Sequence, residues 1–176
     1  ILIGEFAQDR PNSQGVKTKA IYKETAKTYI DIHDNLKFLD GSSKFLWTSE
    51  KDGYNHIYLI NSDQETQLTE GKWEVTQVYG YNNETSTIYF QAAKEHATKR
   101  EVYSLNISNN QLRKLSLQSG TNEAEFSSTF DYYIHYNTTA NTPHYITLHN
   151  KSGKLIKVLK DNSALKERMS KFDLSQ

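Results

Sequence analysis

Histidine, serine and carboxylate side chains are the groups in this sequence that could catalyse a reaction or bind a metal, so their spacing is the first test of function. A serine hydrolase of the α/β type would place its nucleophile in a Gly-x-Ser-x-Gly turn, and a zinc peptidase would carry His-Glu-x-x-His. Neither pattern occurs in the 176 residues. The six histidines show no zinc-ligand spacing: His33, His56, His96, His135, His144 and His149.

Other site chemistries find equally little support. His56, His135, His144 and His149 lie in strand-like runs, where we expect hydrogen-bonded structural histidines. There is no glycine-rich phosphate loop, and Asp9 and Asp31 have no carboxylate neighbours at calcium-loop spacing. The sequence therefore predicts no catalytic, cofactor-binding or metal-binding residue and no cofactor. Four Asn-x-Ser/Thr triplets, which we interpret as turn chemistry rather than glycosylation sites, begin at Asn83, Asn106, Asn137 and Asn150.

Charge and cysteine content narrow the class of partner. Lys and Arg (21) balance Asp and Glu (21) without a basic block, so we expect no nucleic acid and no membrane contact. The absence of Cys excludes disulfides and thiolate sites, and it fits a cytosolic or a periplasmic protein equally. The opening residues 1–6 are too short for a signal peptide or a membrane span, and they lack an initiator Met. We therefore expect an excised or processed piece.

The stretch 41–75 shows the element that the chain repeats. Three strand-like runs, 44–49, 56–61 and 65–69, are separated by Gly, Asp and Asn turn signals, which predicts an antiparallel meander. The consecutive apolar residues Phe45, Leu46 and Trp47 make this strand apolar on both faces, which indicates a strand buried between neighbours. We expect Trp47 and Trp73 to be buried between or within sheets.

The same runs return at a period of about 44 residues, within the range of one propeller blade. The matching runs begin at 45, 88 and 132 (FLWTSE, IYFQAA, YYIHYN), at 56, 101 and 144 (HIYLIN, EVYSLN, HYITLH), and at 65, 112 and 156 (ETQLT, LRKLS, IKVLK). A lead strand precedes each set (TYIDIH, WEVTQV, AEFSST), and the last turns are Ser62-Asp63, Asn109-Asn110 and Ser152-Gly153.

We therefore predict an all-β chain, a β-propeller fragment of about three and a half four-stranded antiparallel blades with a short C-terminal helix. A β-sandwich with similar spacing is the alternative. The expected propeller domain covers 1–161, with units at about 16–26, 27–71, 72–118 and 121–161. Residues 8–14 read as a loop, and 16–24 resemble the last strand of an incomplete unit.

The last residues, 162–176, change character. Asn162 can cap a helix in which Leu165, Met169 and Phe172 form one apolar stripe. We expect a short exit helix or linker that packs on the last blade or on a following domain.

Several motifs together resemble a known family. The segments WTSE (47–50), DGYNHIY (52–58), LTEGKWEV (68–75) and VLKDNSAL (158–165) are similar to the N-terminal propeller of dipeptidyl peptidase IV, in a form like that of Bacteroidetes-type bacteria. The resemblance runs over about 24–165, and the first 20 residues match poorly. It implies a periplasmic or cell-surface parent in which an eight-bladed propeller gates a C-terminal α/β-hydrolase domain. That parent removes Xaa-Pro or Xaa-Ala dipeptides from peptide N-termini with a Ser-Asp-His triad.

The resemblance transfers no site residue to this chain. The family holds the substrate amine with an adjacent Glu pair, and no Glu-Glu occurs here. An Arg and an aromatic residue that reach the substrate in some members are replaced by Tyr29-Ile30-Asp31. Two hypotheses remain: a non-catalytic propeller portion, whose partners are the hydrolase domain and peptide substrates, or a stand-alone protein-binding module. Because fewer than four complete blades leave faces uncovered, we also expect self-association, with a two-fold dimer as its closed form.

Overall fold

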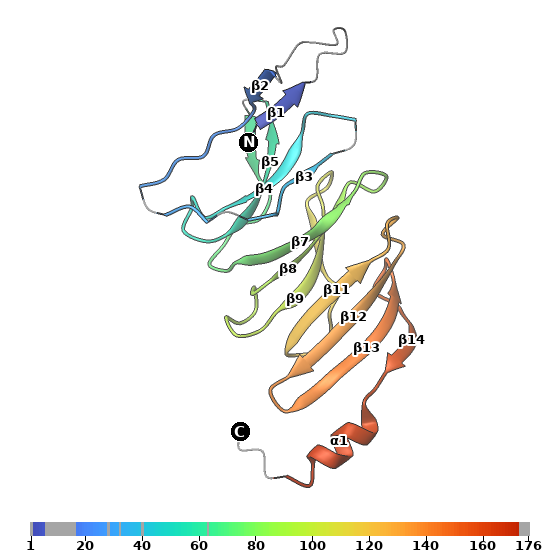
Figure 1. Ribbon diagram of the computed structural model, residues 1–176. Helices are drawn as coiled ribbons and strands as arrows, with labels where there is room; N and C mark the ends of the chain where they lie inside the picture. Colours follow the sequence, from blue (N-terminus) through green and yellow to red (C-terminus); the bar gives the residue numbers. More distant parts are fainter. Residues whose placement is uncertain are drawn as a thin grey trace, which may run out of the picture.

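The fold consists of three antiparallel sheets that follow one another in chain order. The computed structural model describes residues 2–5, 17–27, 29–31, 33–39, 41–62 and 64–172. Figure 1 shows the sheets side by side, with the N-terminal hairpin at one end and α1 at the other. The predicted partial propeller is thus confirmed, because a sandwich would have two facing sheets. Among the described residues, no helix has the length and apolar character needed to cross a membrane.

Each sheet has four strands in sequence order, and a separate hairpin precedes them. The first sheet comprises β3 (Lys37–Phe38), β4 (Phe45–Ser49), β5 (His56–Asn61) and β6 (Gln64–Gln67). The second comprises β7 (Val75–Asn82), β8 (Thr87–Ala92), β9 (Glu101–Asn106) and β10 (Gln111–Lys114). The third comprises β11 (Thr121–Phe126), β12 (Tyr132–Thr139), β13 (Thr142–Asn150) and β14 (Leu155–Lys160). The hairpin pairs β1 (Leu2–Glu5) with β2 (Lys17–Ala20), and α1 spans Ser163–Met169.

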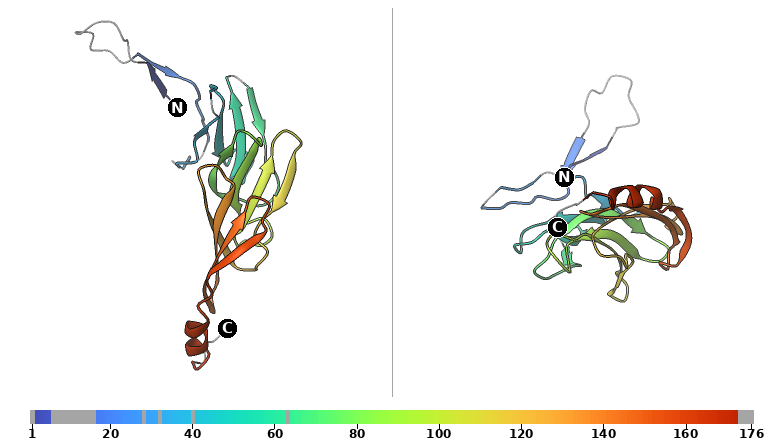
Figure 2. Two further views of the ribbon diagram at one scale, coloured as in Figure 1. Left: turned by 90° about the vertical axis from the view of Figure 1, so that its right-hand side faces the viewer. Right: turned by 90° about the horizontal axis from the view of Figure 1, so that it is seen from below.

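Two apolar cores join the sheets in series. Leu46 and Ile57 of the first sheet pack against Ile88 and Phe90 of the second. The other face of the second sheet forms a smaller core with the third sheet, in which Tyr89 contacts the cluster around Tyr133. Ile88 and Phe90 of β8 belong to the first core, and Tyr89 between them belongs to the second. This strand is therefore apolar on both faces, as predicted from the sequence. The two ends of the chain lie far apart in Figure 1 and in the left-hand view of Figure 2.

The alternation of faces corrects one detail of the predicted repeat. Phe45 and Ile88 point toward the preceding part of the chain, and Tyr133, not Tyr132, does so in the third sheet. The third run is therefore displaced by one residue from the position that the sequence spacing gave. Since side chains alternate along a strand, such a displacement decides which residues are buried.

The turn between the third and fourth strands is the same in all three sheets. Ser62, Asn110 and Gly153 each have a positive φ, of 54°, 56° and 82°. This left-handed conformation is favourable for Gly and tolerated by Asn, and it recurs where the sequence predicted turns. The predicted loop 8–14 lies outside the described residues, and the assignment of 16–24 to an incomplete unit stays a prediction.

The predicted lead strand of the first sheet is wrong. The segment 28–33 forms no strand in its described part; instead β3 pairs with Phe45 and Leu46 at the start of β4. Farther along β4, the carbonyl of Thr48 accepts a hydrogen bond from the His33 ring at 2.8 Å. A side chain therefore occupies the position on the β4 edge that a lead strand would take.

The two tryptophans differ in burial. Trp73 is buried, as predicted, with its ring edge-on to His56. The prediction for Trp47 is only partly right, because its ring lies on the outer face of the first sheet and stays partly exposed. There it contacts the rings of Tyr22 and His33, with centroids 6.1 and 4.4 Å away. An irregular segment, rather than a neighbouring sheet, covers it.

The C-terminal helix forms where it was predicted, but its cap differs. Asn162 adopts a left-handed conformation, and its side-chain nitrogen donates to the backbone carbonyl of His144 at 2.5 Å. The carboxylate of Asp161 instead accepts from the Ser163 amide at 3.1 Å. No residue of α1 is buried, and Leu165 and Phe172 are exposed. Two of the three stripe residues are therefore exposed, whereas Met169 is partly buried and α1 lies next to β13 of the last sheet.

Candidate functional site

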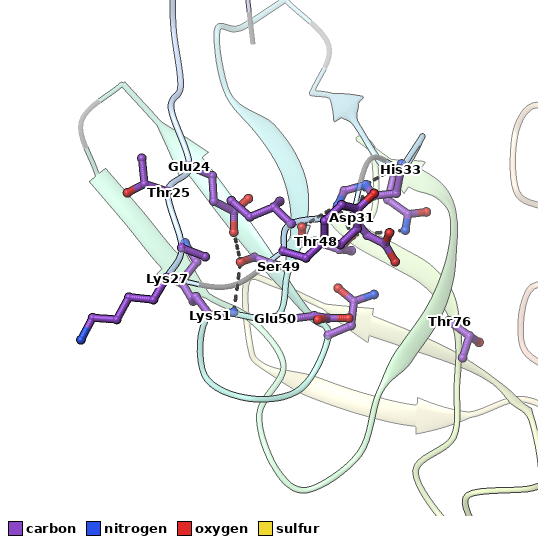
Figure 3. A pocket seen from close by; sticks show the side chains of 15 residues that line it. Glu24, Thr25, Lys27, Asp31, His33, Thr48, Ser49, Glu50, Lys51 and Thr76 are labelled. Carbon is purple, nitrogen blue, oxygen red and sulfur yellow. Dashed lines mark hydrogen bonds between the residues drawn. The ribbon is translucent and has the colours of Figure 1, made fainter.

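A cavity of about 430 Å³ lies between the irregular segment 24–35 and the end of β4. Its wall is built by side chains of that segment, by the turn after β4, and by one residue of β7. Figure 3 shows the labelled members, among which six carry the polar chemistry: Glu24, Asp31, His33, Ser49, Glu50 and Lys51. Most of the cavity wall thus comes from residues outside the observed strands.

Glu24 anchors one side of this cavity to β4. Its carboxylate accepts a hydrogen bond from the Trp47 indole nitrogen at 2.7 Å and another from the Ser49 hydroxyl. Both donors are neutral groups. These two hydrogen bonds fix the start of the irregular segment to side chains of β4.

His33 and Asn35 anchor the other side. The side-chain nitrogen of Asn35 donates to the Thr48 hydroxyl at 3.2 Å. Its side-chain oxygen accepts a hydrogen bond from the backbone amide of Val78, also at 3.2 Å. His33 also contacts the Thr48 hydroxyl, at 3.0 Å from its Nε2. Asn35 therefore links the first two sheets beside the cavity.

The charged side chains around the cavity differ in whether they form ion pairs. Lys51 donates to Glu65 at 2.5 Å and to the Tyr22 hydroxyl at 3.0 Å. Burial opposes its positive charge, but these two hydrogen bonds outweigh that cost and raise the pKa of Lys51. Figure 3 shows Lys27 extending away from Asp31. The cavity wall therefore keeps a negative character.

Two carboxylates and an aromatic ring on the cavity wall are available for a ligand. Within the described residues, no hydrogen bond or ion pair holds the side chain of Asp31 or of Glu50. Tyr29, two residues before Asp31 in the chain, is 81% exposed. Such a surface suits a cationic or hydrogen-bond-donating group, and the Tyr29-Ile30-Asp31 run singled out in the sequence lines it.

Of the four histidines expected to be hydrogen-bonded structural residues, His56, His135 and His149 are so held, whereas the exposed His144 side chain has no hydrogen bond to a described residue. His56 contacts the Thr69 hydroxyl at 3.0 Å and the Gly71 carbonyl at 2.9 Å, and His135 contacts the Asn122 side-chain oxygen at 2.9 Å. In the part of the chain that the structure describes, no group of three or more His, Asp or Glu side chains is placed to hold a metal ion. That this chain has no catalytic, cofactor-binding or metal-binding residue stays a prediction.

The Asn-x-Ser/Thr triplets are used inside the fold. Asn106 and Asn150 accept hydrogen bonds from backbone amides two residues ahead, at 3.0 and 3.1 Å, which confirms their role in turns. Asn137 differs from that prediction. It is buried and donates to the Ser119 carbonyl and to the Asn122 side chain, at 3.1 and 3.0 Å. It therefore links β12 to the start of β11 rather than forming a turn.

Known proteins share this sequence and fold. The chain is 30% identical over 141 aligned positions to "Dipeptidyl peptidase 4" of Trichophyton equinum, which covers 77% of this chain and 18% of that protein. It is 30% identical over 181 positions to the same enzyme of Trichophyton rubrum, covering 95% and 23%. The chain thus spans about a fifth of the length of these relatives.

A solved structure agrees with these relatives. The crystal structure of Porphyromonas gingivalis dipeptidyl peptidase 4 superposes with a TM-score of 0.81 and 37% identity, covering 87% of this chain and 22% of that one. The family model of the dipeptidyl peptidase IV (DPP IV) N-terminal region matches residues 7–144. With three sheets in series and a match over most of its length, this chain belongs to the dipeptidyl peptidase IV N-terminal region family.

Proposed function

We propose that this chain is a non-catalytic part of the propeller of a dipeptidyl peptidase IV-like serine exopeptidase, which removes Xaa-Pro or Xaa-Ala dipeptides from peptide N-termini. The observation that carries the proposal is the 37% identity to the bacterial enzyme over 87% of this chain. In this role the chemistry belongs to a C-terminal hydrolase domain of the parent. The propeller gates and positions the peptide.

The cavity beside β4 is the part of the chain that we assign to peptide positioning. Its support is the exposed Tyr29 and the nearby Asp31, whose carboxylate pairs with no described residue, together with the hydrogen bonds that fix Glu24 and His33 to β4. A peptide offers backbone N–H groups and a terminal ammonium, and both are donors for a carboxylate. The anchored ends of the segment would hold Asp31 at a defined place.

Activity measurements on two polypeptides test this proposal. The 176-residue chain alone should not hydrolyse a Gly-Pro chromogenic substrate, whereas the longer polypeptide from the same gene should, with loss of activity under a serine-directed inhibitor. Turnover by the pure 176-residue chain, or a gene without a Gly-x-Ser-x-Gly segment, would contradict it. The second outcome would favour the stand-alone binding module.

A single substitution tests the cavity separately. In the longer polypeptide, Asp31→Asn should raise KM about tenfold with little change in kcat, because one hydrogen bond to a charged group is lost in substrate binding. Asp34→Asn is the matched control, since Asp34 is also exposed but does not line the cavity. Equal KM values for the two variants would remove the cavity from the proposal while leaving the enzyme assignment intact.

We further propose that the parent works in the periplasm or at the cell surface of a bacterium. The support is the likeness to the Porphyromonas gingivalis enzyme. Cell fractionation followed by immunodetection of the polypeptide tests the location, and recovery in the cytosolic fraction alone would contradict it.

A further inference from the structure

A β-bulge interrupts β7 beside the cavity. The register of β7 on β8 shifts between Val75 and Gln77, so Thr76 is an extra residue without a partner on β8. A bulge of this kind bends the strand and redirects the side chain of the extra residue. Thr76 is half-buried and lines the cavity, and Figure 3 shows its side chain on the side away from Lys27. The bulge therefore places a hydroxyl-bearing residue in the cavity wall.

The buried side chain of Gln91, on β8, fixes the direction of the Thr76 hydroxyl. The side-chain nitrogen of Gln91 donates to the backbone carbonyl of Asn122 at 2.7 Å. A carbonyl can only accept, so the nitrogen must lie on that side and the side-chain oxygen of Gln91 must face Thr76. The Thr76 hydroxyl lies 2.7 Å from this oxygen and therefore donates its hydrogen to it.

Asn122 is itself held from several sides, which gives its carbonyl a defined position. Its side-chain nitrogen donates to the carbonyl of Arg100 at 2.8 Å. Its side-chain oxygen accepts from the ring of His135 at 2.9 Å and from the side-chain nitrogen of Asn137 at 3.0 Å. The group that orients Gln91 is thus fixed in the interior between the second and third sheets.

We propose that Thr76 is a specificity-determining residue of the cavity, and that Gln91 is a positioning residue that acts through it. A hydroxyl usually rotates to donate or to accept, but the hydrogen of Thr76 is committed to Gln91. Its oxygen can therefore only accept from a ligand, and no described residue donates to it. This inference rests on the peptide-positioning role proposed above, and it adds a donor group of the peptide as the partner of Thr76.

A wall that only accepts hydrogen bonds selects the chemistry of its ligand. The carboxylates of Asp31 and Glu50 accept when ionised, and Thr76 adds a neutral acceptor. A peptide N–H or ammonium group gains a hydrogen bond from such a wall, whereas a peptide carbonyl would meet lone pairs. Gln91 thus prevents the hydroxyl from turning to serve either kind of group.

The same stretch of β7 also holds the segment that carries Asp31. The backbone amide of Val78, two residues after Thr76, donates to the side-chain oxygen of Asn35 at 3.2 Å. Asn35 lies at the end of the irregular segment and lines the same cavity. One strand therefore holds both Thr76 and the segment that supplies the charged acceptor.

Steady-state kinetics of the longer polypeptide with a Gly-Pro chromogenic substrate test the hydroxyl. Thr76→Val keeps nearly the same shape and removes the acceptor, so KM should rise about fivefold with kcat unchanged. Thr76→Ser keeps the hydroxyl and should keep the wild-type KM. Thr87→Val is the matched control, because Thr87 is also half-buried in the second sheet and its hydroxyl also donates, to the Thr85 carbonyl at 3.0 Å, but it lies outside the cavity. This control should leave KM unchanged.

A double-mutant cycle tests whether Gln91 acts through Thr76. Gln91→Met should raise KM about threefold, because the hydroxyl can then rotate. Thr76→Val combined with Gln91→Met should show the increase of Thr76→Val alone, whereas independent effects would multiply to about fifteenfold. Gln91→Glu should stay close to the wild type, since a buried carboxyl that keeps its proton can donate to Asn122 and accept from Thr76.

The outcomes separate this inference from the function on which it rests. No turnover by the wild-type longer polypeptide would overturn the enzymatic role and this inference with it. Turnover with equal KM for the wild type and Thr76→Val would overturn the assignment of Thr76 alone, as would an equal rise in KM for Thr76→Ser. Multiplying effects in the double variant would overturn the role of Gln91. Far-ultraviolet circular dichroism establishes that each variant is folded, and if Gln91→Met is not, a raised KM for Gln91→Glu overturns that role instead.

Discussion

His135 should make the stability of this chain depend on pH. The ring is buried between the second and third sheets, where its Nε2 lies 2.9 Å from the Asn122 side-chain oxygen and its centroid 5.6 Å from that of His149. Burial, and secondarily the charge of His149, lowers the pKa of His135 from 6.5 to about 4. The native protein therefore keeps this ring neutral where an unfolded chain would protonate it.

The sign and size of the effect follow from this difference. Between about pH 6.5 and 4 the unfolded state binds more protons than the folded state, so the free energy of unfolding falls as the pH falls. A difference of about 2.5 pKa units corresponds to about 3 kcal/mol at the acid limit, and to about 2.5 kcal/mol at pH 4.5. The contribution is fully present above about pH 7.

Urea unfolding followed by tryptophan fluorescence at pH 7.5 and at pH 4.5 measures this contribution. His135→Gln removes the titrating group and keeps a donor for Asn122. We expect the wild-type chain to lose about 2.5 kcal/mol more than the variant between the two pH values. Burial raises the pKa of Glu101, which changes stability in the opposite direction, so only the difference between the two proteins isolates His135.

The control is His144→Gln, because His144 is exposed in the same sheet. It should show the wild-type pH dependence. If His135→Gln retains the full acid sensitivity of the wild type, His135 is protonated in the native state or is open to solvent. Either result would refute the reasoning from burial.

Three further effects on the free energy of unfolding are expected, each measured by urea titration at neutral pH. Leu46→Ala should cost about 3 kcal/mol because Leu46 is fully buried between two sheets, and a loss under about 1 kcal/mol would contradict that packing. Trp73→Ala should cost about 4 kcal/mol and Trp47→Ala about half as much, since Trp47 stays partly exposed; the reverse order would contradict the structure. Gly120→Ala should cost more than about 2 kcal/mol, because its φ is +120° and a Cβ would lie 2.3 Å from the Thr138 carbonyl; a neutral result would mean that this turn adapts.

Local patterns in the sequence predicted the strands that pack in series. The runs around Phe45, Ile88 and Tyr133 are short, aromatic and apolar on both faces, and each became the second strand of a sheet. The third run was misplaced by one residue because YYIHYN offers two adjacent tyrosines. Only the contact of Tyr133 with the preceding sheet distinguishes them, and this contact is made by distant residues.

The lead strand of the first sheet could not be predicted, for a different reason. TYIDIH alternates like a half-buried strand, but its His33 bonds to Thr48 through the ring, and β3 (Lys37–Phe38) takes the pairing. Propensity describes what a segment prefers alone, whereas the edge of β4 can accept hydrogen bonds from either a backbone or a side chain. The helix cap could not be predicted for the same reason. The side-chain nitrogen of Asn162 donates to the backbone carbonyl of His144, which lies 18 residues earlier in the chain.

The cavity was beyond sequence analysis because it arises from contacts that are not periodic. The cavity exists because Glu24 and Asn35, at the two ends of an irregular segment, bond to β4 and to the second sheet. Neither residue belongs to a motif. The sequence did indicate uncovered faces, from the number of blades, but not which face remains open: Ile21 and Tyr22 pack on the outer side of the first sheet, whereas no described segment covers Ile134. The first and third sheets are therefore covered to different extents by the described chain.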